Sequence, residues 1–118
     1  MSVESDFRAL LAGHAGLTAL VGTRIALNAV PQDSDYPLVV FAAQQRREYG
    51  IDNTLHGIEV TFSVQCYAET AAGAEAVAAQ VRAAVATDAD YLVLDDSTAY
   101  DDELSLDAVL LTVQTWVT

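Results

Sequence analysis

A strict alternation of hydrophobic and polar side chains predicts a β-strand at residues 58–67. A sheet with one buried and one hydrated face requires this period of two. The apolar side is formed by Ile58, Val60, Phe62, Val64 and Cys66, and the other side by Glu59, Thr61, Ser63, Gln65 and Tyr67.

The period changes to that of a helix at Thr70, which is the predicted N-cap of a helix over residues 70–86. One face of this helix is apolar. It carries Ala74, Val77, Ala78, Val81 and Val85. Because the strand and the helix both have an apolar face to bury, we expect them to share one core.

The N-terminal segment predicts two short helices. Phe7, Leu10 and Leu11 recur at helical spacing within residues 4–12, and a second helical turn covers residues 16–21. Gly22 is a plausible C-cap for the second helix. Residues 24–30 are expected to form a short extended piece that Pro31 ends.

A run rich in β-branched and aromatic residues predicts a buried strand at residues 38–45. Residues 46–56 contain the turn formers Gly50, Asp52 and Asn53. We therefore expect a long antiparallel hairpin between this strand and the strand at 58–67, with a tip that projects from the body.

The C-terminal third predicts a short strand or extended piece at 91–94, at or near a sheet edge, a turn-like segment at 95–103 and a final strand at 104–117. One face of the final strand is apolar, and Leu110 and Trp116 make the other face partly apolar. A strand that is apolar on both sides is either central in its domain or covered by a neighbouring subunit.

Together these elements predict an α+β fold in one domain, residues 1–118. We expect an antiparallel sheet of about four strands, with one long helix and short N-terminal helices packed on one face. With 53% hydrophobic residues the chain is not disordered, and it has no apolar run long enough to span a membrane.

The charge balance excludes ordinary affinity for DNA. Seventeen acids face five bases, all of them arginines, for a formal net charge of −12. Such a surface repels phosphate backbones. Either the acids are simply a solvated surface, or they meet a basic partner or face DNA that must slide without sticking.

No pattern for catalysis, a cofactor or a metal ion is found. Cys66 is the only cysteine and is expected to be a buried structural thiol. The two histidines, His14 and His56, have no second ligand at metal-binding spacing and are expected to be polar surface residues. Nucleophile motifs and glycine-rich phosphate loops are missing from the sequence, so we do not expect an enzyme.

Two groups of charged residues are candidate interaction sites. Arg46 and Arg47, beside Tyr49 at the base of the hairpin, are a candidate interface, since arginine and tyrosine are enriched where proteins meet; ordinary surface charge is the alternative. The acidic candidates lack the spacing of a calcium loop. They are Asp95, Asp96, Asp101, Asp102 and Glu103. If subunits form a ring, the arginines could reach this acidic segment of a neighbour.

Three segments in a fixed order carry a resemblance to a known family. FRALLAGHAGLTALVGTRI is similar to its two opening helices and Val-Gly-x-Arg-Ile turn, at Val21, Gly22, Arg24 and Ile25. PQDSDYPLVVF is similar to its Pro-Gln and Pro-led strand, at Pro31, Gln32, Pro37 and Phe41. VQCYAETAAGAEAVAAQVRAAV is similar to its strand-to-helix junction, with Cys66, Tyr67, Ala68 and Arg82, and Trp116 ends the final strand as in the family. In this order the chain resembles the tail completion or tail terminator proteins of long-tailed bacteriophages, which also occur in prophages and gene transfer agents.

The resemblance implies a structural role without catalysis. Such proteins form a ring, typically a hexamer, that caps the head-proximal end of the tail tube, stops its elongation and joins the tail to the head. The implied partners are further copies of the chain, the tail tube protein and a head-neck connector protein, while DNA passes through the bore. The implied location is the virion tail, after assembly in the bacterial cytoplasm.

Two features bear on this interpretation. Self-association would cover the second apolar face of the final strand, at Trp116. The flank of that strand is acidic, where the family would place basic residues. Two alternatives stay open: a head-tail connector or neck protein of the same assembly, and a small acidic bacterial binding module for calcium or a basic protein.

Overall fold

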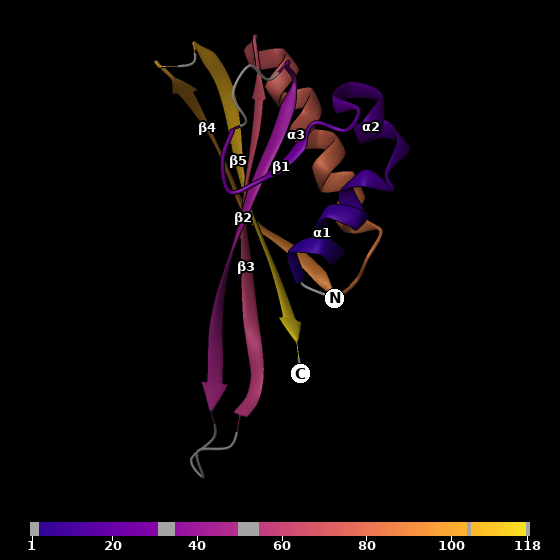
Figure 1. The fold of residues 1–118 in the computed structure, drawn as a ribbon, viewed down its shortest axis with the longest axis vertical. Coiled ribbons are helices and arrows are strands. Elements are labelled where there is room, and N and C mark those ends of the chain that lie inside the picture. Colours follow the sequence, from indigo (N-terminus) through magenta and orange to yellow (C-terminus); the bar gives the residue numbers. More distant parts are fainter. Residues whose placement is uncertain (1–2, 31–34, 50–54, 104, 118) are drawn as a thin grey trace.

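Three helices pack on one face of a five-stranded sheet in the computed structural model, which describes residues 3–30, 35–49, 55–103 and 105–117 (Figure 1). The elements are α1 (Val3–Ala12), α2 (Ala15–Val21), β1 (Ile25–Leu27), β2 (Leu38–Tyr49), β3 (Leu55–Ala68), α3 (Ala71–Ala86), β4 (Tyr91–Asp101) and β5 (Leu106–Val117). The α+β class and the placement of the helices on one face are confirmed.

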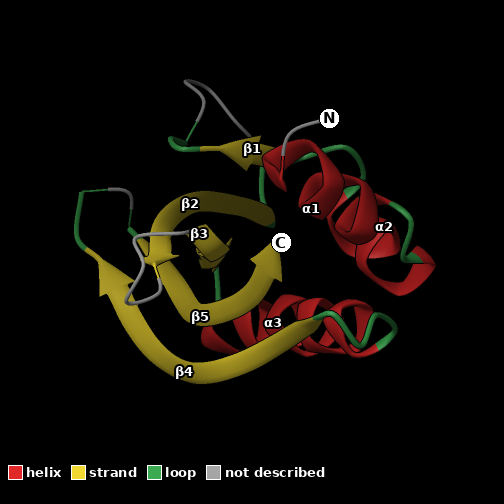
Figure 2. Cartoon of the chain, turned by 90° about the horizontal axis from the view of Figure 1, so that it is seen from below, coloured by secondary structure: helices red, strands yellow, loops and turns green. Residues whose placement is uncertain are grey.

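The strand order is β1-β2-β3-β5-β4. The pairs β2–β3, β3–β5 and β5–β4 are antiparallel, as predicted, whereas β1 lies parallel to β2. The sheet is therefore mixed and has one strand more than expected, because three residues of the predicted extended piece pair with β2. It is strongly curved when viewed along its strands (Figure 2).

The predicted strand-to-helix unit is confirmed. Thr70 is the N-cap of α3, and its hydroxyl oxygen accepts a hydrogen bond from the Gly73 N–H at 3.0 Å. The apolar face of the helix, including Val77 and Val81, is buried against the apolar face of β3. Burial of Cys66 in the same core agrees with its expected structural role.

Aromatic side chains join α1 to the sheet. The Phe7 ring stacks on Phe62 of β3 with 4.1 Å between centroids and meets the edge of Phe41 of β2 at 5.3 Å. Tyr91 of β4 lies 5.6 Å from the same ring. Phe7 is fully buried, so this one side chain connects the N-terminal helix with three strands.

The Gly22–Ile25 turn has a clear physical basis. Gly22 has a φ of 60°, which a residue without a side chain adopts at little cost. The Arg24 guanidinium then donates to the carbonyl of Pro37 at 2.9 Å and to that of Leu20 at 3.3 Å. Arg24 thus ties the end of α2 to the start of β2.

The largest differences from the predicted boundaries are at the ends of β2 and β4. β2 runs through Arg46 and Arg47 to Tyr49, so the arginines lie near the far end of a strand rather than at a hairpin base. β4 extends to Asp101, where a turn was expected. Both segments are polar and exposed. They form strands because an adjacent strand provides backbone hydrogen-bond partners, and hydrophobic periodicity in the sequence does not reveal this pairing. The predicted tip residues Gly50, Asp52 and Asn53 lie outside the described residues, as do Pro31 and Gln32.

We expect Phe7→Ala to lower the free energy of unfolding by about 3–5 kcal/mol, because it removes a buried ring and leaves a cavity. Urea denaturation followed by circular dichroism measures the loss. Leu20→Ala, at a partly exposed position of α2, is the control and should cost well under half as much. Equal losses for the two variants would contradict the role of Phe7.

Candidate interaction surfaces

The sheet face opposite the helices, called the open face here, is polar over much of its length. Strand register places side chains of β2, β3 and β5 in rows across it. Successive rows are Arg46–Glu59–Trp116, Gln44–Thr61–Gln114 and Ala42–Ser63–Thr112. No described helix covers these rows (Figures 1 and 2).

A second, smaller apolar cluster closes one end of the open face. It contains Leu38, Val40, Tyr67, Leu106 and Ala108, with Leu110 packed against it. The second apolar face of β5 is thus partly covered within the subunit. Trp116, at the other end of β5, is 50% exposed.

The predicted interface residues do not form one patch. Arg46 and Trp116 lie on the open face, in one row with Glu59, and Arg46 pairs with the Glu59 carboxylate at 2.9 Å. Arg47 pairs across the ladder with Ile58, so it lies on the helix-bearing face, and Tyr49 shares that face two residues on. Consecutive side chains of a strand point to opposite faces of the sheet. The sequence prediction had grouped Arg46 and Arg47 because it placed them at the base of a hairpin.

The predicted acidic residues are also divided. Asp95 lies opposite Thr112 and faces the open side, whereas Asp96 lies opposite Leu111 and faces α3. Asp101, Asp102 and Glu103 lie at the far end of β4, where they line an open pocket of about 480 Å³ next to Tyr67. Burial raises the pKa of the Tyr67 hydroxyl, and the charge of Asp101 raises it further.

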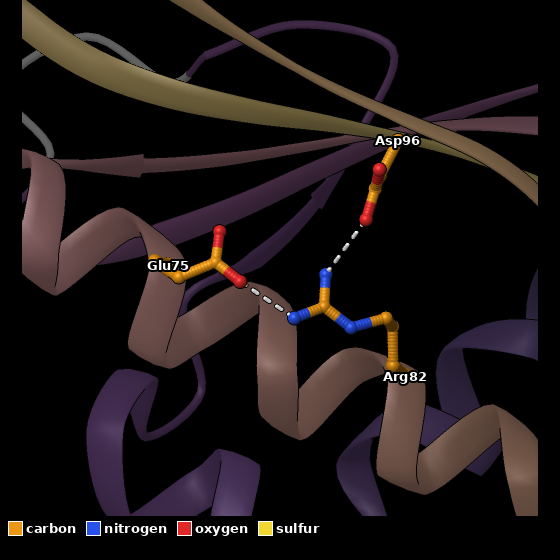
Figure 3. A network of polar contacts seen from close by, with 3 residues as sticks. All are labelled: Glu75, Arg82 and Asp96. Carbon is orange, nitrogen blue, oxygen red and sulfur yellow. Dashed lines mark hydrogen bonds and ion pairs between the residues drawn. The ribbon is translucent and has the colours of Figure 1, made fainter.

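Arg82 of α3 makes two ion pairs, one with Glu75 on the same helix and one with Asp96 of β4 (Figure 3). Its guanidinium lies 2.6 Å from the Glu75 carboxylate and 3.2 Å from the Asp96 carboxylate. The Arg82 side chain is 32% exposed. The sequence analysis named Arg82 and Asp96 but not Glu75, and only the sheet topology shows that Asp96 lies beside the helix.

The remaining polar candidates take structural roles. His14 hydrogen-bonds the side-chain oxygen of Gln80 at 3.1 Å and so links the start of α2 to α3; the side chain of His56 is outside the described part. Burial raises the pKa of the Cys66 thiol to about 12, although the nearby Arg82 charge lowers it. In the ranges that the structure describes, no three potential metal ligands gather, and no helix is long and apolar enough to cross a membrane.

The chain is similar to a protein family and to solved structures. The family model for "Tail completion protein gp17" matches residues 5–118. A chain in a solved structure titled "Virion of native gene transfer agent (GTA) particle" matches with a TM-score of 0.80 and 21% identity, over 98% of this chain and 94% of that one. This likeness shows a shared fold. No curated protein matches.

We expect Arg82→Ala to lower the free energy of unfolding by less than about 1 kcal/mol, because exposed ion pairs contribute little. The loss should shrink further in 1 M salt, which screens exposed charges. Urea denaturation at both salt concentrations measures it. A loss of several kcal/mol would show that the arginine is essential for packing α3 against β4.

We expect the Cys66 thiol to resist a thiol reagent in the folded protein at pH 8 and to react in urea. The buried thiol stays protonated up to about pH 12, while in the unfolded chain it ionises near 9. This difference favours the unfolded state above pH 9, so stability should fall as the pH rises from about 9 to 12. Rapid labelling of the native protein would contradict the buried position.

Proposed function

Because this chain belongs to the family of tail completion protein gp17, we propose that it forms a ring on the head-proximal end of a tail tube. Membership makes it a structural protein of a bacteriophage-type virion tail. In the proposed role the ring stops the addition of tube subunits and joins the tail to the neck of the head. The observation that carries the proposal is the family match over nearly the whole chain.

The open face supports a bore that lets DNA slide. Its rows carry amides and hydroxyls, its one described arginine is already paired with Glu59, and Asp95 adds a carboxylate on the β4 side. The chain as a whole has a net charge of −12. Cationic side chains bind duplex DNA by releasing counterions, so a lining poor in them holds DNA weakly. We propose that this face, with Asp95 and Asp101, lines the bore.

The relative from the gene transfer agent supports the location. That chain is part of a particle titled as a virion and shares the fold over almost its full length. A head-tail connector or neck protein of the same particle is the alternative, and it differs by the partner on which the ring sits. The proposal therefore needs a test that involves the tube itself.

We expect the purified protein to stop growth of tail tubes when it is mixed with polymerising tube protein from the same particle. Electron microscopy should show shorter tubes with one end capped, and the mean length should fall as the protein is added in larger amounts. Light scattering should give the free or released cap a mass that is a discrete multiple of 12.5 kDa. An unrelated acidic protein is the control for charge effects.

Unchanged tube lengths with no bound protein would overturn the terminator role. Binding to a connector protein instead of the tube would assign the chain to the neck.

A further inference from the structure

One edge of the sheet, at β1, is closed to further strands by short-range hydrogen bonds. The Ile25 N–H donates to the Thr23 carbonyl at 2.8 Å, and the Ile25 carbonyl accepts from the Arg8 guanidinium at 3.3 Å. The Leu27 carbonyl accepts from the Ala29 N–H at 3.0 Å. Since these groups already have partners, β1 offers little to an incoming strand.

Two other stretches of edge have no second strand beside them among the described residues. β1 pairs only with residues 39–41 of β2, so residues 42–49 of β2 have a strand on one side only within the described structure. β4 likewise pairs only with β5 among the described strands, over residues 91–101. Unpaired N–H and C=O groups along a strand are a template for another strand.

The two open edges have complementary charge. The β2 edge carries Arg46 on the open face and Arg47 on the helix-bearing face. The β4 edge carries Asp95 on the open face and Asp96 on the helix-bearing face. A continuous sheet keeps each face on its own side, so an arginine and a carboxylate would share each face of a joined sheet. These contacts would add to the ion pairs that Arg46 already makes with Glu59 and Asp96 with Arg82.

We propose that residues 42–49 of one copy pair with β4 of the next copy and form one sheet across the subunit boundary. This inference rests on the proposed ring. Because the joined edges differ, the contact is heterologous and can close into a ring. β2 and β4 run in opposite directions within the sheet, so a β2–β4 contact between copies whose strands point the same way is antiparallel.

Pairing of two β4 strands fits the structure less well. It would place the aspartates of one copy beside those of the other, and like charges on adjacent strands are destabilising. A symmetric β4 contact would also use both copies of the edge and end at a dimer. The β2–β4 contact avoids the repulsion and covers Leu92 of β4, which is 60% exposed.

Cysteine pairs on the open face test the contact. Gln44→Cys on β2 is combined in turn with Leu92→Cys, Asp95→Cys or Ser97→Cys on β4, to sample three registers. Within one chain the two edges are three strand spacings apart, about 14 Å, which is too far for a disulfide. The native Cys66 is buried and does not interfere.

We expect at least one pair to give a ladder of disulfide-linked dimers, trimers and larger species when the assembled protein, free or on tube ends, is oxidised. Single variants should give no species beyond a dimer. Gln44→Cys with Ala79→Cys, which places the second thiol on the exposed side of α3, is the matched control and should not link.

The remaining outcomes distinguish failure of the edge pairing from failure of the ring. A ring-sized species that none of the three pairs links would overturn the edge pairing and leave the ring standing. Efficient dimers from Leu92→Cys alone would indicate β4–β4 pairing and overturn the β2–β4 contact. If the protein neither assembles nor caps tubes, the proposed function fails.

Discussion

The structure depends on a main core that lies between the helices and one face of the sheet. The stacked rings of Phe7 and Phe62, with Phe41 beside them, fix α1 against the strands, and α3 fills the rest of that layer. The three helices of the described residues all lie on this face, so no described helix covers the other face, where only the small cluster around Tyr67 is buried. Its side chains must therefore tolerate water or a partner.

Sequence patterns predicted the elements that bury apolar side chains. The strand that ends at Ala68 and the helix after Thr70 were recognisable because each has one apolar face, and both are buried in the same core. The short edge strand at residues 91–94 was predicted, but its continuation to Asp101 was not, because an exposed edge strand does not need apolar alternation. Hydrophobic periodicity thus describes the core well and the sheet edges poorly.

The candidate sites were harder to predict because their geometry depends on strand register. Arg46 and Arg47 were grouped by adjacency, but the extended backbone sends them to opposite faces. The bridge from Arg82 to Glu75 and Asp96 joins residues from two elements. The residue patterns gave no function. The family resemblance, confirmed by the match over residues 5–118, identified the chain as a tail completion protein.

Separation of the core from the open face has an evolutionary consequence. Positions such as Gln44, Thr61 and Gln114 lie in rows on the open face, away from the buried rings. Surface substitutions of this kind usually change stability by no more than about 0.5 kcal/mol. Mutation can therefore vary the chemistry of this face while the fold is kept. Relatives with few identical residues can share one backbone fold and still differ in the side chains of this face.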